Sequence, residues 1–167
     1  MLRLLATAAM VALLGSGCAV EIVSDFDGGP GTPLPVTRLR AEPYSFAYFS
    51  GMDDSTRLVV RDADQWQQAW NAIGRGSSPA EPLPQVDFAQ EMVIVAALGS
   101  RSSGGFSIYV DSAYQQVDHV EVVVRKVSPS AGCLTIAAFT QPVDIARLPA
   151  STLPVRFRER GIVHSCG

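Results

Sequence analysis

The order of hydrophobic and polar residues along the chain predicts a series of short strands. Met92–Leu98 is an unbroken apolar run, which is typical of a strand buried on both faces. Apolar and polar residues alternate over 106–111 and again over 120–125, as in strands with one face toward solvent. Val123 breaks the second alternation by facing the polar side, so we expect that strand to be covered on both faces. Further short strands are predicted at 44–49, 57–60, 134–139 and 142–146.

A final strand is predicted where Val155 and Phe157 alternate with arginines. The two apolar side chains would face inward, which leaves Arg156, Arg158 and Arg160 together on the opposite face. Such a stripe is typical of a solvated outer face or of an edge strand protected by charge. The alternative is a surface that binds an acidic partner.

One helix is expected between Asp62 and Gly74. Asp62 is a suitable N-cap, and Gly74 is a suitable stop. Between them, four apolar residues at spacings i, i+3, i+4 and i+7 form one stripe, which is typical of a helix face packed on a core: Trp66, Ala69, Trp70 and Ile73. A ligand platform made by the two tryptophans is the less favoured interpretation.

Together these elements predict a mostly β or α+β domain. We expect a twisted antiparallel sheet of about six to eight strands, packed with one short helix at about 62–73. The domain is expected to occupy 43–167 as a single unit, because the segment 18–42 is dense in Gly and Pro and is typical of a flexible linker.

The segment 1–17 has the features of an export signal. Arg3 precedes an apolar run from Leu4 to Leu14, which is too short to span a bilayer, where about 20 residues are needed, but suits a signal peptide. The run LLGSGC ending at Cys18 resembles the bacterial lipobox, although Gly15 stands where Leu is preferred. We therefore expect lipid attachment at Cys18 and anchoring on the periplasmic side of a membrane, the outer one in a Gram-negative cell. The alternative is a soluble periplasmic or secreted protein.

The cysteine count supports lipidation of Cys18 and predicts one disulfide. The chain has 167 residues and three cysteines, so lipidation of Cys18 leaves Cys133 and Cys166 as an even pair. In an oxidising compartment they are expected to join. Two free buried thiols are the alternative. A metal site that includes His164 is disfavoured, because no fourth ligand lies nearby in the sequence.

Charge and motifs exclude several functions. The formal net charge is −3, which disfavours a nucleic-acid binder. The sequence has no Gly-x-Ser-x-Gly elbow, dinucleotide fingerprint, phosphate loop or twelve-residue calcium loop. His119 follows Asp118 between two predicted strands, where a hairpin turn is the simpler role. We therefore expect no catalytic residues, no cofactor, no metal and no small-molecule substrate.

The segment 99–108 is the strongest candidate for a binding site. It joins two predicted strands through a loop rich in Gly and Ser, and glycines let a backbone approach another surface closely. The candidate partner-binding residues are Arg101, Ser102, Ser103, Gly104 and Gly105. The alternative is an elaborate hairpin loop with no partner.

Several motifs resemble the C-terminal domain of the PrcB family. They are Asp87-Phe88, Glu91-Met92-Val93, Gly99-x-Arg101-x-x-Gly104-Gly105-Phe106-x-Ile108, and Thr140 to Ile145 followed by Leu148-Pro149. The resemblance covers about Asp62 to Pro149. Ser102-Ser103 replaces the usual Pro-Thr, Phe106 stands where Tyr is common, and the cysteine pair and the tail lie outside the pattern.

This resemblance implies an extracytoplasmic lipoprotein, similar to a subunit of a secreted bacterial protease complex. We therefore expect a non-catalytic, membrane-tethered binding module that serves as an accessory or stabilising subunit for a secreted or envelope protease. One alternative is a protease inhibitor that presents the 99–106 loop, by analogy with small β-domain inhibitors of the chagasin-like group. Another is a structural envelope lipoprotein with no protease partner.

Overall fold

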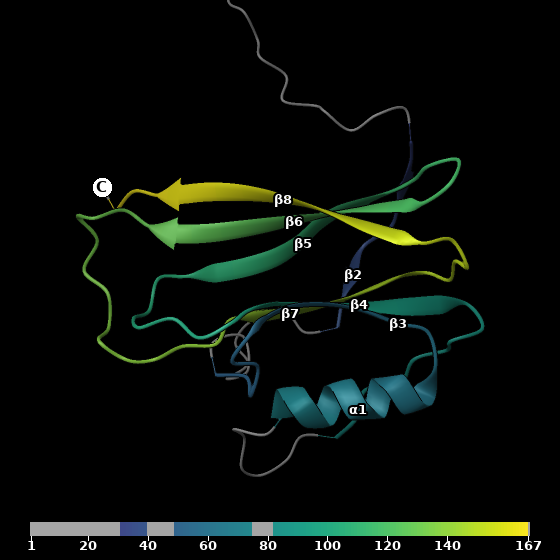
Figure 1. Ribbon diagram of the computed structural model, residues 1–167, viewed down its shortest axis with the longest axis horizontal. Coiled ribbons are helices and arrows are strands. Elements are labelled where there is room, and N and C mark those ends of the chain that lie inside the picture. The colour runs from purple at the N-terminus through teal and green to yellow at the C-terminus, as the bar shows by residue number, and fades with distance from the viewer. Residues whose placement is uncertain (1–30, 40–48, 75–81, 167) are drawn as a thin grey trace, which may run out of the picture.

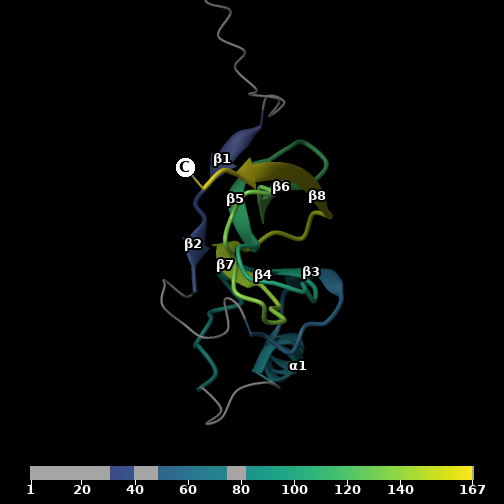
Figure 2. The same cartoon turned by 90° about the vertical axis from the view of Figure 1, so that its left-hand side faces the viewer.

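The computed structural model describes residues 31–39, 49–74 and 82–166, which form two four-stranded sheets and one helix (Figure 1). The strands are β1 (Thr32–Leu34), β2 (Thr37–Arg38), β3 (Ser55–Val60), β4 (Glu91–Leu98), β5 (Ser107–Gln115), β6 (Val120–Pro129), β7 (Val143–Pro149) and β8 (Val155–His164), and the helix is α1 (Ala63–Ile73). Sheet A has the order β1-β5-β6-β8, and sheet B has the order β2-β7-β4-β3. Figure 2 shows sheet A, sheet B and α1 as successive layers.

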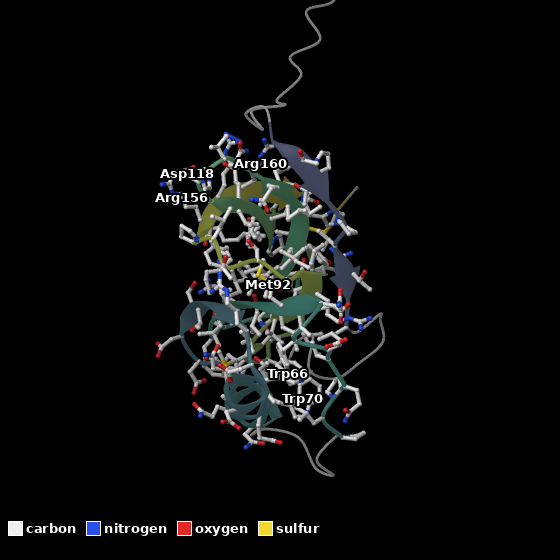
Figure 3. All side chains as sticks on the ribbon, turned by 90° about the vertical axis from the view of Figure 1, so that its right-hand side faces the viewer. Trp66, Trp70, Met92, Asp118, Arg156 and Arg160 are labelled. Carbon is white, nitrogen blue, oxygen red and sulfur yellow. A yellow bond between two sulfur atoms is a disulfide. The ribbon has the colours of Figure 1, made fainter. Side chains whose placement is uncertain are left out.

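Strand β4 is buried on both faces, as its unbroken apolar run predicts. Met92 and Ile94 contribute to the core between the two sheets, whereas Val93 and Val95 pack in a second core against α1. Figure 3 shows Met92 between the sheets. Every residue from 92 to 98 is buried because sheet B is the middle layer, and β4 lies inside that sheet between β7 and β3.

Helix α1 has the predicted cap, stripe and end. The Asp62 carboxylate accepts a hydrogen bond from the backbone N–H of Gln65 at 2.8 Å. The buried residues of the helix are the four predicted ones, Trp66, Ala69, Trp70 and Ile73. The two indole rings are 5.3 Å apart and face sheet B (Figure 3), and the Trp66 Nε1 donates to the Pro84 carbonyl at 2.9 Å. The tryptophan pair therefore belongs to the core.

Strand β6 is also covered on both faces. Val120, Val122 and Val124 point into the core between the sheets. Val123 points the other way and is nevertheless only 3% exposed. Its register partner on β8 is Arg158, and the aliphatic stems of long side chains can cover such a position. The expectation drawn from Val123 is confirmed.

The mostly β class with a single short helix is confirmed, and the topology adds two features. The strands divide between two sheets, and β8 runs parallel to β6 rather than antiparallel. Between these two strands the chain crosses into sheet B as β7, so it returns to sheet A in the original direction. Hydrophobic alternation reports which face a residue takes and carries no information on strand direction.

Part of the predicted linker is folded. Thr32–Leu34 pair with β5 in sheet A, and Thr37–Arg38 pair with β7 in sheet B, so this segment passes from one sheet to the other. The boundary expected at 43 is therefore wrong by at least eleven residues, since the domain includes Thr32. Pro33 is compatible with β1 because that strand is at an edge, where a missing N–H removes no ladder bond.

One other predicted strand differs from the structure, and a second lies mostly outside the described residues. Residues 134–139 form a loop, in which Leu134 and Phe139 are exposed. Of the strand predicted at 44–49, only Phe49 is described, and it forms a single parallel bridge with Gln141. The predicted signal peptide, the lipid-attachment residue Cys18 and the rest of 44–49 lie outside the described residues.

Candidate functional site

The Gly-rich loop 99–106 lies against a second loop, 130–142, at one end of the two sheets (Figure 1, left). The backbones of Arg101 and Thr140 exchange two hydrogen bonds, of 2.8 and 2.9 Å. The Thr140 hydroxyl also donates to the Ser103 carbonyl at 2.9 Å. We call these two segments the paired loops. The Gly99–Ile108 motif is therefore one half of a two-loop structure.

Gly104 and Gly105 allow another segment to approach the loop closely, and that segment belongs to the same chain. The Gly104 N–H donates to the Ile136 carbonyl, and a Cβ on Gly104 would lie 2.7 Å from Cγ1 of Ile136. Gly105 has φ +86°, and its Cβ would lie 2.9 Å from Cγ2 of Thr135. Gly104 is buried by this packing, while Gly105 and Ser102 stay exposed.

The Arg101 side chain is directed at its own loop. Its guanidinium donates to the carbonyls of Leu98 at 2.8 Å and Ser100 at 3.1 Å, and lies 5.9 Å from the centre of the Phe106 ring. Arg101, a candidate partner-binding residue, therefore makes its contacts within its own loop. The strand end at Leu98 leaves carbonyls that a five-donor side chain can satisfy. Phe106 packs against the core between the sheets, as its alternation with Ile108 predicts.

An aspartate that the sequence analysis missed connects the two loops. The Asp53 carboxylate accepts hydrogen bonds from the Ser100 hydroxyl at 2.9 Å and from Gln141 Nε2 at 2.6 Å. Its backbone carbonyl accepts from the Ser100 N–H at 2.8 Å. Asp53 precedes β3 by two residues, and only the tertiary structure brings it beside segments that lie about 50 and 90 residues away, as expected for non-local loop contacts.

The disulfide predicted between Cys133 and Cys166 is present. It joins the loop 130–142 to the residues that follow β8, with a Cα–Cα distance of 5.2 Å. The Ser130 N–H also donates to the His164 carbonyl at 2.9 Å. The loop is therefore fixed to sheet A by a covalent bond as well as by hydrogen bonds.

Exposed apolar side chains gather around the paired loops. Seven large hydrophobic residues are exposed in the described part of the chain. Six of them belong to this end, and we call them the apolar end surface: Phe49, Leu134, Ile136, Phe139, Ile162 and Val163. Leu134 and Phe139 are 102% and 75% exposed. The apolar residues of the strand predicted at 134–139 are therefore side chains that no internal core covers.

A pocket of about 390 Å³ opens beside this surface. Both paired loops and the end of β8 line it, and the lining includes Phe49, Phe106, Leu134, Ile136 and His164. Its walls are mainly apolar, with the disulfide at one side. An apolar side chain of a partner is the kind of group that such a pocket accommodates.

The two histidines lie in different places. His119 is in the turn between β5 and β6, where its Nδ1 is 2.6 Å from the Asp118 carboxylate. That contact lowers the pKa of Asp118, with a smaller contribution from Arg156, which lies beside it in Figure 3. His164 lies at the other end of sheet A. Among the described residues, no three His, Cys, Asp or Glu side chains are grouped as a metal site would require.

No helix within 31–39, 49–74 and 82–166 is long and apolar enough to cross a membrane.

Comparison with known proteins gives one match. Residues 92–149 match the family described as PrcB C-terminal, and no curated protein or solved structure matches the chain. The matched segment runs from β4 to β7 and contains both paired loops, whereas α1 precedes it. This agrees with the resemblance seen in the Gly99–Ile108 motif, and the segment 92–149 is similar to the PrcB C-terminal family.

Proposed function

We propose that this chain is a non-catalytic, extracytoplasmic binding module that serves as an accessory or stabilising subunit of a secreted or envelope protease. The match of residues 92–149 to the PrcB C-terminal family supports a role in a protease complex. The proposal places the contact with the protease at the apolar end surface and the pocket beside it.

The observation that carries this proposal is the concentration of exposed apolar side chains at one end. Single exposed hydrophobic residues are normal, but a contiguous group beside a pocket marks an interaction site. Three of its residues, Leu134, Ile136 and Phe139, are on a loop that a disulfide and the Arg101–Thr140 bridge hold in place. A loop held in this way has less conformational entropy to lose when it binds.

The inhibitor alternative needs the Gly-rich loop to enter a protease cleft. The hydrogen bonds of Arg101 and the packing of Gly104 on Ile136 occupy much of that loop within the domain. Ser102 and Gly105 are the exposed positions that such an inhibitor would present. An accessory subunit that uses the broader apolar end surface needs no change in this loop.

The proposed lipid anchor at Cys18 is compatible with this placement. Thr32 of β1 pairs with Gln115 at the end of β5, while Ser107 starts β5 beside the paired loops. The nine residues of β5 separate these points by about 26 Å at the rise of a strand. A protein attached through its N-terminal segment would thus present the apolar end surface away from the attachment point.

The experiment is capture of the protease from detergent-solubilised envelope by the tagged, full-length protein. The double variant Leu134→Ser and Phe139→Ser should lose capture without a change in melting temperature, because both side chains are exposed. Val117→Ser is the matched control, since Val117 is 101% exposed in the hairpin at the other end. This control should capture the protease as the wild type does.

Each result has a distinct meaning. If the wild type captures no protease, the proposed function is wrong. If the double variant captures it as well as Val117→Ser does, the function stands and the contact surface is wrong. A peptidase assay on the captured complex separates the alternatives, because an accessory subunit preserves or prolongs protease activity and an inhibitor lowers it.

The anchor is tested by Cys18→Ser, which should abolish acyl labelling and release the protein from the membrane fraction. Stable attachment needs more than one acyl chain, as a bacterial lipoprotein carries. A wild-type protein that is already soluble in the periplasm would show that Gly15 prevents processing.

A further inference from the structure

Strand β8 is the last strand of sheet A, so one side of it has no paired strand among the described residues. It is ten residues long, and edges of this length are templates for pairing with another chain. The other edge of the sheet is the three-residue β1. The free side of β8 is thus the largest unpaired edge of sheet A.

The parallel ladder determines which backbone groups face this free side. The Pro154 carbonyl accepts a hydrogen bond from Val120 of β6, and the His164 carbonyl accepts one from Ser130, the residue that follows β6. In a parallel pair, alternate residues direct both their N–H and C=O to the partner strand. The even-numbered residues of β8 therefore face β6, and Gly161 and Val163 direct their N–H and C=O outward.

Charge protects only the first part of this edge. Glu159 forms ion pairs with Arg57 of β3 and with Lys126, which closes the space between the two sheets at that point. Beyond Arg160 the strand has no charge until His164. A Cβ on Gly161 would meet nothing within 4 Å, and Val163 is 69% exposed. Natural sheets place charges, Pro or bulges on edges to prevent pairing, and 161–163 has none of these.

The unprotected part of β8 ends at the pocket. His164 and Cys166 line it, and the disulfide fixes Cys166 to the loop 130–142. An added strand would place alternate side chains on each face of sheet A. One end of such a strand would reach the apolar walls formed by Leu134 and Ile136.

The local charge indicates what kind of strand would be added. Strands β6 and β8 together carry five basic and two acidic residues, a net of +3 in a chain whose net charge is −3. Arg156, Arg158 and Arg160 are on the outer face of the edge strand, where Arg156 forms an ion pair with Asp118 and Arg158 with Glu121. Two copies joined through β8 would bring these arginine stripes together, so charge disfavours a second copy and favours an acidic segment.

We propose that the edge of β8 from Gly161 to His164 accepts an extended segment of the partner protein as an additional strand. That segment alternates acidic residues with apolar ones, and an apolar side chain at its end enters the pocket. The inference rests on the proposed function, because it describes how the partner protease is held. Backbone hydrogen bonds supply affinity in this mode, and the pocket and charges supply specificity.

The first test uses a capped eight-residue peptide that alternates Glu and Val, and the same peptide with Lys in place of Glu as its control. Hydrogen exchange is followed residue by residue by NMR on the full-length protein in detergent. In the free protein the amides of Gly161 and Val163 should exchange quickly and that of Ile162 slowly. The acidic peptide should slow the first two by about tenfold, equivalent to about 1.4 kcal/mol of protection.

Three variants of one residue separate backbone pairing from other contacts. Val163→Pro removes an N–H that β6 does not use, so it should abolish protection while the domain stays folded. Val163→Thr keeps the N–H and should behave as the wild type. If Val163→Pro does not fold, Val163→Glu takes its place, because a negative charge at an exposed position of the edge repels the acidic peptide.

Several results would overturn the inference. They are no protection by the acidic peptide, equal protection by the basic peptide, and protection that survives in both Val163→Pro and Val163→Glu. A wild-type dimer by sedimentation that Val163→Pro dissociates would mean that a second copy occupies the edge. In the protease capture experiment, capture by both the wild type and Val163→Pro would refute the strand addition alone, and no capture by the wild type would refute the proposed function.

Discussion

The carboxylate of Asp144 accepts a 2.7 Å hydrogen bond from the backbone N–H of Val110 across the space between the two sheets. Val110 precedes the β-bulge of β5, where the register with β6 shifts. Arg38 of β2 donates to the same carboxylate and to the Val110 carbonyl, each at 3.3 Å. One buried side chain on β7 thus connects β5 of sheet A with β7 and β2 of sheet B.

Removing this acceptor should destabilise the domain. Asp144→Ala leaves the Val110 N–H buried without a partner, which costs about 1–3 kcal/mol of unfolding free energy. Asp144→Asn keeps an oxygen in place and should cost less. Urea denaturation measures both variants. Equal losses in the two variants would show that the charge on Asp144, rather than the hydrogen bond to Val110, is what stabilises the fold.

The same residue should give stability a specific pH dependence. Burial raises the pKa of Asp144 above its ordinary value of 3.8, and the Val110 N–H and Arg38 oppose this. Because the folded state holds the proton more tightly, the contribution of Asp144 to stability is largest in acid. It declines as the pH rises from 3.8 through the raised pKa.

The comparison of the wild type with Asp144→Asn isolates this effect. The difference in unfolding free energy between them should favour the wild type most below pH 3.8 and shrink toward neutral pH. A difference that instead grows with pH would show that Arg38 and the Val110 N–H outweigh burial and lower the pKa.

A side chain on Gly104 should disturb the packing of the paired loops. Gly104 is buried, and a Cβ there would lie 2.7 Å from Cγ1 of Ile136, so that the Ile136 side chain would have to move, and Gly104→Ala should cost about 1–3 kcal/mol. Gly132→Ala is the matched control from the facing loop, because its Cβ would meet nothing within 4 Å and its φ is not positive. Thermal unfolding compares the two. Equal melting temperatures would mean that the paired loops separate readily in solution.

The sequence predicts elements well where one residue pattern has one physical cause. The stripe from Trp66 to Ile73 and the cap at Asp62 are local, so helix α1 follows from them. The run Met92–Leu98 predicts two-sided burial because a strand in a middle layer has no polar face. The Cys133–Cys166 pair follows from parity once one cysteine is assigned to the lipid.

The rest depends on contacts that a sequence pattern does not encode. Leu134, Thr135 and Ile136 alternate as a strand would, but these apolar side chains have no core to enter. The strand Thr32–Leu34 is not evident from the sequence, because its Gly and Pro neighbours are typical of a linker. An edge strand tolerates these residues as well. Arg101 was expected to face a partner, since the sequence does not show that Leu98 and Ser100 present their carbonyls to it.

Arg101 should therefore affect stability before it affects binding. Arg101→Ala removes the hydrogen bonds that the guanidinium donates to the Leu98 and Ser100 carbonyls. A hydrogen bond from a charged group contributes about 1.5–3 kcal/mol to stability, and the net loss is smaller where water replaces the side chain. We expect Arg101→Ala to lower the melting temperature. Ser102→Ala should leave the melting temperature unchanged, because the Ser102 side chain is exposed. An unchanged melting temperature together with lost protease capture would make Arg101 a contact residue instead.

The disulfide should stabilise both the domain and the end of β8. It closes a loop with a sequence separation of 33, which the chain-entropy estimate values at about 3–4 kcal/mol. In protein purified without reductant, Cys133 and Cys166 should resist alkylation until they are reduced. The double variant with Ser at both positions should lose stability by that amount, and reduced wild type should match it.

Faster hydrogen exchange in that variant should be concentrated in 130–139 and 161–166, because the bond joins these segments. Ready alkylation of both thiols in the folded, unreduced protein would show that the bond does not form. A uniform loss of protection across both sheets would show that it stabilises the whole domain rather than the edge and loop that it connects.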